Sequence, residues 1–212
     1  MIIYRDMEQG SEEWSQARIG KMTASRFADL MTEPRSKSDK FSKTTESYLM
    51  QLAVEKVLGK PLPSFKSEAM QRGNDMEPIA RNFYELKNGV EVEQVAFIEL
   101  NEFCVVSPDG LVSADGLLEI KAPDTLTQVR RYLNKEGLPQ EYFWQVQGQL
   151  WIAERSWCDF VSFDDRIDTD AQYIQTRVYR DDEAIKKLSD KVTVCAEILS
   201  NYIEQLSKPF EF

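Results

Sequence analysis

The sequence S-P-D-G-L-V-S-A-D-G-L-L-E-I-K-A-P, at residues 107–123, decides the fold expected around it. It places Asp109 on a turn, reverses the chain at residues 114–116 and continues into a strand at residues 116–121. Alternate side chains of a strand point to the same face, so Glu119 and Lys121 share one face. Because charges buried among apolar neighbours must be paired or bind something, we expect this pair to have a specific role.

Two carboxylates beside a lysine suit the metal-assisted hydrolysis of a phosphodiester. Mg²⁺ prefers oxygen ligands and usually takes one or two protein carboxylates. Two such ions can activate a water and stabilise the leaving oxygen, and a nearby ammonium group helps to position or deprotonate that water. The Glu-x-Lys pattern also arises by chance: Glu85-Leu86-Lys87 is a second example, which we interpret as the solvated face of a helix.

The composition describes a single globular domain over residues 1–212. Of these residues, 42% are hydrophobic and 29% are charged, which is typical of a folded chain. No apolar run approaches the roughly 20 residues that cross a bilayer, and residues 1–9 lack the apolar segment of a signal peptide. We therefore expect a cytoplasmic protein that does not associate with membranes.

Histidine is absent from the chain, and its three cysteines are widely spaced. The absence of histidine excludes Ser-His-Asp catalysis, Cys-His catalysis and histidine metal sites. Cys104, Cys158 and Cys195 lie in apolar stretches, so we expect free thiols in the core. Any catalysis must use carboxylates, lysine, tyrosine, hydroxyl groups and a metal.

Charge is unevenly distributed along the chain. The net charge of −10 argues against a nucleic-acid partner, because phosphate contacts need lysine and arginine. However, the first 72 residues hold 12 Lys+Arg against 10 Asp+Glu, and the remainder holds 14 against 26. The polar segment at residues 35–43 carries four cations and is predicted to be a mobile loop, which suits either local DNA binding or simple solvation.

Helical and strand-like segments along the chain predict an α/β fold. Helices are expected at residues 23–31 with Thr23 as the N-cap, at 44–58, from Asn74 or Asp75 to about residue 88, at 142–154, and at 182–206, where the pattern is amphipathic. Strands are expected at residues 94–100, 103–106, 116–121, 157–163 and 173–179. A central mixed sheet flanked by helices is the natural arrangement.

Five motifs, in this order, resemble those of one enzyme family. They are G-S-E-E-W-S-Q-A-R-I-G-K-M-T-A-S (10–25), R-G-N-D-M-E-P-I-A-R (72–81), S-P-D-G (107–110), L-E-I-K-A-P (118–123) and Y-F-W-Q-V-Q-G-Q-L-W (142–151). P-D-G followed by L-E-I-K resembles the PD-(D/E)xK nuclease superfamily, and the five motifs together resemble the lambda exonuclease (viral recombinase) family. The resemblance implies a restriction-endonuclease-like core.

The resemblance also implies a metal site. Asp109, Glu119 and the Ile120 carbonyl would bind Mg²⁺, with two ions in each site and Mn²⁺ as an alternative ion. Lys121 would orient or activate the attacking water.

Two further catalytic residues follow from the same resemblance. Glu77 would support the metal and the water, although a glutamate in the first turn of a helix is also favoured by the helix dipole. Gln145 matches the family's glutamine on the helix after the core strands, and Gln147 is the less favoured choice for that position.

Residues that contact DNA are implied as well. Arg18, Thr23 and Ser25 would bind a 5′-phosphate, because a guanidinium and hydroxyls near a helix N-terminus suit a terminal phosphate; without the resemblance, a capped helix with a surface arginine is the simpler interpretation. The remaining DNA contacts would come from the basic segment, from an apolar wedge and from an aromatic residue: Arg35, Lys37, Lys40, Lys43, Met70 and Tyr142.

The function implied is that of a Mg²⁺-dependent, processive 5′→3′ exonuclease acting on ends of double-stranded DNA that carry a 5′-phosphate. It would release 5′-mononucleotides and leave 3′ overhangs for phage-type recombination with a single-strand annealing protein. A homotrimeric ring is implied too. Two alternatives stay open: a structure-specific or restriction-like endonuclease, and a non-catalytic protein that binds DNA ends.

Overall fold

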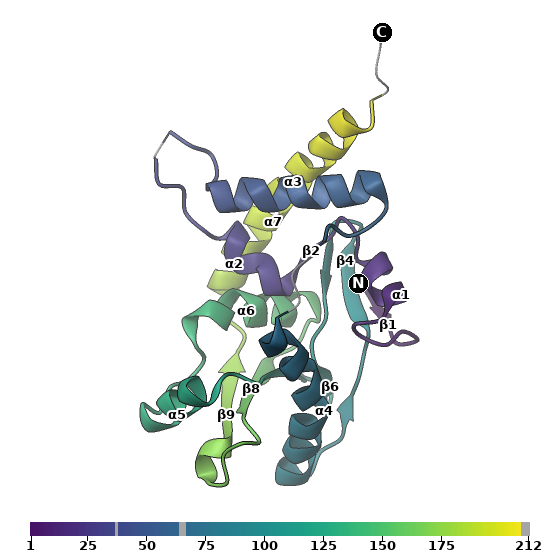
Figure 1. Ribbon diagram of the computed structural model, residues 1–212. Coiled ribbons are helices and arrows are strands. Elements are labelled where there is room, and N and C mark those ends of the chain that lie inside the picture. Colours follow the sequence, from purple (N-terminus) through teal and green to yellow (C-terminus); the bar gives the residue numbers. More distant parts are fainter. Residues whose placement is uncertain (37, 64–66, 209–212) are drawn as a thin grey trace.

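The computed structural model describes residues 1–36, 38–63 and 67–208 and shows an α/β architecture (Figure 1). The predicted fold class is confirmed, but the strands form two sheets rather than one central sheet. One sheet has five strands in the order β3-β6-β7-β8-β9, and the other has four in the order β1-β4-β5-β2. The second sheet pairs N-terminal strands with strands about 80–100 residues later, a pairing that no local sequence pattern reveals.

The five-stranded sheet contains the predicted functional strand at its centre. Its strands are β3 (Val92–Glu93), β6 (Gly110–Val112), β7 (Gly116–Lys121), β8 (Trp157–Phe163) and β9 (Tyr173–Tyr179). β6 and β7 form an antiparallel hairpin in which Val112 is opposite Gly116, which confirms the predicted reversal. β7 and β8 are parallel, so a crossover must join them; it contains α5 (Thr125–Leu133), η2 (Gln140–Tyr142) and α6 (Phe143–Ile152).

The four-stranded sheet brings the N-terminal segment next to this hairpin. Its strands are β1 (Ile2–Tyr4), β4 (Phe97–Asn101), β5 (Cys104–Val106) and β2 (Met22–Thr23). β2 is parallel to β5, with Thr23 opposite Val105. The segment after Thr23 therefore runs beside the turn that carries Asp109.

Helices cover β7 on both sides, so the side chains on both faces of the strand are buried. Leu118 and Ile120 pack with Ala80 and Tyr84 of α4 (Glu68–Asn88) in one apolar cluster. Leu117 belongs to the larger cluster that includes core residues of α6. Glu119 and Lys121, two and four residues after Leu117, consequently face α6.

The prediction that Asn74 or Asp75 caps α4 is wrong. The helix begins at Glu68, and the Ser67 hydroxyl accepts a hydrogen bond from the Met70 amide at 3.2 Å. The two extra turns include Gly73 and Asn74, which disfavour helix interiors, but an ion pair fixes this part of the helix to the sheet: Arg72 lies 2.7 Å from a carboxylate oxygen of Asp164. A contact over 92 residues of sequence thus overrides the local signals.

The upper part of the molecule in Figure 1 is helical. It comprises α2 (Phe27–Leu30), α3 (Lys43–Leu58) and α7 (Asp182–Leu206). α1 (Glu12–Ala17) lies beside β1, η1 (Ala24–Arg26) leads into α2, and η3 (Asp170–Gln172) precedes β9. α7 has the predicted bounds, and α3 starts one residue early with Ser42 as its cap. The predicted helix at 23–31 is divided into η1 and α2, and the Thr23 side chain makes no capping bond.

α6 packs closely against α2 because Gly148 lacks a side chain. A β-carbon at this position would lie 2.3 Å from the Phe27 ring, well inside van der Waals contact. Phe27 and Val146 are fully buried in the same cluster. The close approach joins α6, which lies over Glu119, to the segment that follows Thr23.

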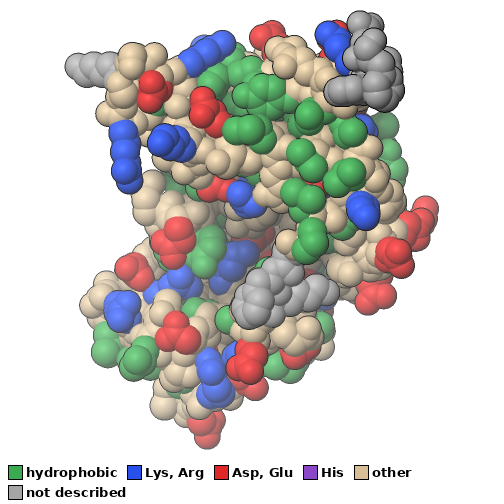
Figure 2. Space-filling model, turned by 45° about the horizontal axis from the view of Figure 1, so that its top comes forward, with side chains coloured by type: hydrophobic (Ala, Val, Ile, Leu, Met, Phe, Trp, Pro, Cys, Tyr) green, Lys and Arg blue, Asp and Glu red, His purple; other side chains and the backbone are tan. Residues whose placement is uncertain are grey.

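The predicted core thiols are confirmed: Cys104, Cys158 and Cys195 are free and buried. Across the described residues, none of the helices combines the length and apolar character needed to cross a bilayer. Hydrophobic side chains gather on the upper part of the face shown in Figure 2. On α3, Met50, Val57 and Leu58 are exposed.

Candidate active site

β7 places Glu119 and Lys121 side by side, as the alternation of the strand predicts. Glu119 is 1% exposed, and the Lys121 Nζ lies 2.5 Å from Glu119 Oε1. Burial removes this carboxylate from water, so hydrogen-bond donors and opposite charges of the protein must replace the lost hydration.

Two glutamines of α6 hold the same carboxylate. The Gln145 Nε2 donates to Glu119 Oε1 at 2.5 Å, and the Gln149 Nε2 donates to Glu119 Oε2 at 2.7 Å. The structure thus places Gln145 against Glu119, and its catalytic role stays a prediction. Sequence reasoning missed Gln149, although its spacing of four residues from Gln145 puts both on one face of a helix.

Gln147, the less favoured choice for this position, has a different environment. Its amide nitrogen donates to the Tyr179 carbonyl at 3.0 Å, and its amide oxygen accepts from the Asp181 backbone at 2.9 Å. Gln147 therefore ties α6 to the start of α7 and does not contact Glu119.

Asp109 lies on the turn before β6, against the middle of β7. Its Oδ2 accepts from the Ile120 amide at 2.5 Å, and its own amide donates to the Leu118 carbonyl at 3.1 Å. Burial, together with the nearby charges of Glu119 and Glu77, raises the pKa of Asp109 well above its usual value. The three carboxylates therefore repel one another, and Lys121 offsets this only in part.

Glu77 comes from α4, on the opposite side of the sheet, and is paired with Arg81. Burial raises the pKa of Glu77, and the charge of Arg81 opposes that rise. Arg81 is 7% exposed, and its Nε donates to the Asp109 carbonyl at 3.3 Å. Arg81, which sequence reasoning did not single out, thus connects Glu77 to the turn of Asp109.

Lys121 is held as a cation by its neighbours. Burial lowers its pKa, but the charges of Glu119 and Asp109 outweigh burial, so the net pKa is raised. The Tyr142 ring centroid is 5.3 Å from the Lys121 Nζ, a cation–π distance. The structure therefore brings the predicted Tyr142 to this site.

The residues present fit a hard divalent cation. Asp109 and Glu119 supply oxygen donors, and the repulsion that raises the Asp109 pKa is what a cation would relieve. Within the described ranges, no three His, Cys, Asp or Glu side chains converge into a cage for a metal. That sparse donor set suits Mg²⁺, which usually keeps waters and binds substrate phosphate. Whether the Ile120 carbonyl is a further ligand stays a prediction.

The predicted phosphate pocket lies where β2 meets η1. The Arg18 guanidinium stacks 3.6 Å from the Trp14 ring centroid, and burial lowers its pKa to about 10. The hydroxyls of Thr23 and Ser25 are 3.3 Å apart, and the Thr23 amide donates to the Tyr48 hydroxyl at 3.1 Å.

Two buried donors near this pocket lack partners among the described residues: the Arg18 Nε and the hydroxyl of Ser107. Ser107 follows β5, beside the chain that leaves β2, and precedes the turn of Asp109. Buried donors of this kind normally have partners, so both are suited to an anion. Ser107 was quoted in a motif, but sequence reasoning gave it no role.

The remaining predicted DNA contacts are surface residues. Arg35 and Lys40 are exposed on the segment that leads into α3, Lys43 is exposed at the first position of that helix, and the prediction for Lys37 lies outside the described residues. Met70 is 57% exposed in the first turn of α4. Their roles stay predictions.

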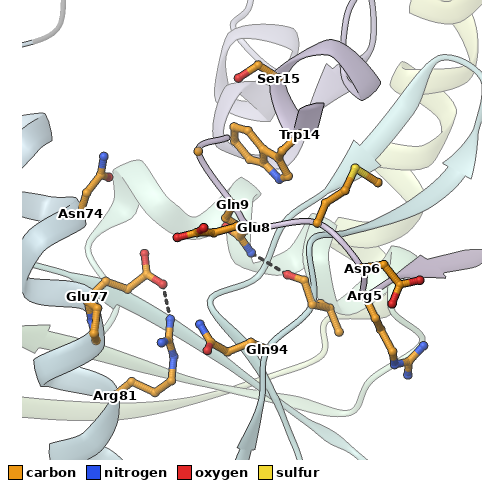
Figure 3. A pocket seen from close by; sticks show the side chains of 14 residues that line it. Arg5, Asp6, Glu8, Gln9, Trp14, Ser15, Asn74, Glu77, Arg81 and Gln94 are labelled. Atoms are coloured by element: carbon orange, nitrogen blue, oxygen red, sulfur yellow. Dashed lines mark hydrogen bonds and ion pairs between the residues drawn. The ribbon is translucent and has the colours of Figure 1, made fainter. Parts of the chain in front are cut away.

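A cavity of about 870 Å³ adjoins the site between α4 and the N-terminal segment. Figure 3 shows Glu77 and Arg81 on one wall, the loop with Glu8 and Gln9 opposite them, and the Trp14 ring projecting from α1. Both Glu77 and Arg81 also interact with Asp109, so one wall of the cavity is shared with the carboxylate cluster.

The sequence profile of the YqaJ-like viral recombinase domain matches residues 13–156. The chain is also 30% identical over 173 residues to the uncharacterized protein R354 of Acanthamoeba polyphaga mimivirus. That match covers 73% of this chain and 29% of the relative, so the chain spans less than a third of that protein's length.

Solved structures agree with the fold. The crystal structure of an alkaline exonuclease from Laribacter hongkongensis has a TM-score of 0.83 and 38% identity, covering 92% of this chain and 96% of that one. The same exonuclease in complex with dAMP gives the same values. A phage related exonuclease from Haemophilus somnus 129PT shares the fold at 20% identity, with a TM-score of 0.68 over 88% of this chain and 96% of that one.

Proposed function

Because the chain belongs to the YqaJ-like viral recombinase family, we propose that it is a Mg²⁺-dependent nuclease that degrades one strand of duplex DNA from its 5′ end. The observation that carries this proposal is the buried Glu119, held by Lys121 and two glutamines beside Asp109. The 38% identity to an alkaline exonuclease supports it.

The chemistry is hydrolysis at the first internucleotide phosphate. Water attacks the phosphorus, a new P–O bond forms, the bond to the O3′ of the terminal nucleotide breaks, and the O3′ takes up a proton. Lys121 orients the attacking water, while Gln145 and Gln149 keep Glu119 in one orientation. Mg²⁺ bound by Asp109 and Glu119 would stabilise the charge that develops on the phosphate oxygens.

Recognition of the 5′ end belongs to the pocket of Arg18, Thr23 and Ser25. The unpaired buried donors of Arg18 and Ser107 suit a terminal phosphate. Each cleavage releases a 5′-mononucleotide and leaves a 5′-phosphate on the shortened strand, so the same pocket can engage the new end. This cycle supports processive degradation that leaves a 3′ overhang.

Arg35, Lys40, Lys43 and, by the sequence pattern, Lys37 would contact the duplex backbone. Met70, exposed at the start of α4, would separate the strands. Tyr142 would contact the displaced strand beside Lys121.

The assembly that we propose is a homotrimeric ring, working with a single-strand annealing protein in the cytoplasm. The exposed apolar residues of α3 supply a surface of the kind that mediates subunit or partner contacts. Light scattering of the purified protein tests the ring directly, and a monomer at working concentration would rule it out.

The function is tested by incubating linear and closed circular duplex with the protein, with Mg²⁺ and with EDTA. We expect mononucleotides from linear DNA in Mg²⁺ only, and an intact circle. Nicking of the circle would favour the endonuclease instead, and binding of ends without digestion would favour the non-catalytic alternative.

The end-recognition pocket has its own test. Arg18→Ala should lower the preference for 5′-phosphate over 5′-hydroxyl ends by about tenfold, because one charge-assisted hydrogen-bonding group is lost. The measurement is the initial rate on the two ends. An unchanged preference would remove Arg18 from the pocket.

A further inference from the structure

We propose that the cavity between α4 and residues 5–15 receives the uncharged part of the 5′-terminal nucleotide, its sugar and base, with Trp14 as the surface on which the base stacks. The inference rests on the proposed function and adds to it a third binding element, which adjoins the phosphate pocket through Trp14 and the carboxylate cluster through Glu77 and Arg81.

The position of the cavity is the first argument. Trp14 lines it and carries the Arg18 guanidinium 3.6 Å from its ring, which places the cavity beside the phosphate pocket. Glu77 and Arg81 line it on the other side, and Arg81 donates to the Asp109 carbonyl. A terminal nucleotide has its 5′-phosphate at one end and the scissile phosphate at the other, so its nucleoside must lie between these two sites.

The charges of the lining favour a neutral group. Arg5 is paired with Glu93 at 2.7 Å, and Arg81 is paired with Glu77. Asp6 and Glu8 add negative charge to the wall. A phosphate would be repelled there, whereas a sugar and a base carry no charge and meet amide and hydroxyl groups, including those of Gln94 and Ser15.

The size and rigidity of the cavity also fit. Its volume of about 870 Å³ is within the range of roughly 300–1,000 Å³ for small-molecule sites. The Trp14 ring is fixed, because its Nε1 donates to the Ala96 carbonyl at 2.9 Å while Arg18 covers one face. In Figure 3 the ring projects from α1 toward the loop that carries Gln9, and Trp14 lines the cavity. Aromatic stacking accepts every base, as a nuclease without sequence preference requires.

The opposite wall is tied to the catalytic turn. The Gln9 side chain donates to the Val95 carbonyl at 2.8 Å and to the Pro108 carbonyl at 2.9 Å, and Pro108 precedes Asp109. The loop at residues 5–10 is thereby held at a constant distance from the carboxylates. A nucleoside in the cavity would be positioned relative to the metal site by the protein backbone.

The experiment compares two linear duplexes, both with a labelled 5′-phosphate. One ends in a mismatched thymidine and the other in an abasic residue, so neither terminal residue is paired and the two differ only in the base. Release of the first residue is followed at subsaturating DNA with Mg²⁺. We expect the wild type to act about tenfold faster on the thymidine end, within the range for one base stacked on an aromatic ring.

Two variants locate the effect. Trp14→Leu removes the ring, and Ser15→Met fills the cavity without adding an aromatic surface; each should reduce the tenfold preference to less than about threefold. Glu13→Met, on the exposed first turn of α1 and outside the cavity, is the matched control and should keep the preference. Because both ends carry the same phosphate, any indirect effect on Arg18 cancels in the ratio.

Equal rates of the wild type on the two ends, alongside normal digestion of linear duplex, would overturn this inference and leave the proposed function in place. A preference that persists in both cavity variants would place the base elsewhere and overturn it too. Failure to digest any linear duplex would instead reject the proposed function, so the two failures are distinguishable.

Discussion

Two buried carboxylates on neighbouring strands of one sheet have opposite surroundings. Asp159 on β8 is fully buried; both of its oxygens accept from Arg177 at 2.8 Å, and one also accepts from the Tyr84 hydroxyl at 2.8 Å. Glu119 on β7 is equally buried but shares its lysine with Asp109, and Glu77 adds another negative charge. Under the proposed function, burial alone does not mark a functional carboxylate; negative charge that the protein leaves partly unbalanced does.

Neutralising Glu119 gives the strongest test of the difference between Glu119 and Asp159. Glu119→Gln should lower the rate of nucleotide release by about a thousandfold or more, because the metal loses a charged ligand. The amide relieves repulsion with Asp109, but it takes a counter-charge from Lys121 and turns an NH2 group toward side chains that are themselves donors. We therefore expect a chain that still folds, with Asp109 left opposite Lys121, but with a smaller free energy of unfolding. Rates on linear duplex and a urea unfolding curve measure the two effects, and an active Glu119→Gln enzyme would remove the assignment of the metal site.

The converse change should affect stability and not activity. Asp159→Asn leaves Arg177 without its counter-charge, and breaking a buried ion pair costs roughly 3–5 kcal/mol. Because Arg177 is 44% exposed and regains water, we expect a loss of about 2–3 kcal/mol in the free energy of unfolding. Activity per folded molecule should change less than about threefold. Urea unfolding gives the first quantity, and a large loss of activity at full folding would contradict the comparison.

Gln149 and Gln147 of α6 allow a second test with a smaller expected effect, because only Gln149 contacts Glu119. Gln149→Leu should lower activity about ten- to a hundredfold and weaken Mn²⁺ binding by a similar factor, as is typical when a partner of a metal ligand is lost. Gln147→Leu, the matched control, removes two bonds to the segment before α7, so it should lower stability by about 1–3 kcal/mol and leave Mn²⁺ binding intact.

Equilibrium titration with Mn²⁺ separates these outcomes, because it does not depend on turnover. If Gln147→Leu weakened Mn²⁺ binding as much as Gln149→Leu, general loosening of α6 would explain both results.

The smallest expected effect concerns the cation itself. Mg²⁺ at ten times its dissociation constant should stabilise the wild type by about 1.4 kcal/mol, because it binds the folded state only. Asp159→Asn should keep this increment, and Glu119→Gln should lose it. Thermal unfolding with and without Mg²⁺ measures the increment, and an equal gain in all three proteins would indicate nonspecific binding.

The sequence predicted the parts of the fold that depend on local periodicity. The bounds of β7, β8, β9 and α7 follow from alternating or helical apolar patterns, and so does the shared face of Glu119 and Lys121. The start of α4 was missed because Gly73 and Asn74 suggest a helix boundary, whereas the pairing of Arg72 with Asp164 extends the helix.

The candidate site was predicted less completely. The sequence shows that Gln149 shares a helix face with Gln145. However, its bond to Glu119, like the bond from Arg81 to the Asp109 carbonyl, could be recognised only once α6 and α4 were known to lie on opposite sides of β7. Asp159, another charge within an apolar strand, attracted no prediction, and only its pairing with Arg177 of the next strand shows why it can be buried. The division of the strands into two sheets depends on pairings between distant segments, which local patterns do not encode.

The tight contact between Gly148 and the Phe27 ring has a consequence for product length. It locks the helix that steadies Glu119 to the segment that begins at the end-phosphate pocket. Under the proposed function, this contact fixes the distance between the end-phosphate pocket and the metal site, and that distance corresponds to one nucleotide. The length of the released product would then be set by the packing of α6 against α2, and it would be one nucleotide for every base.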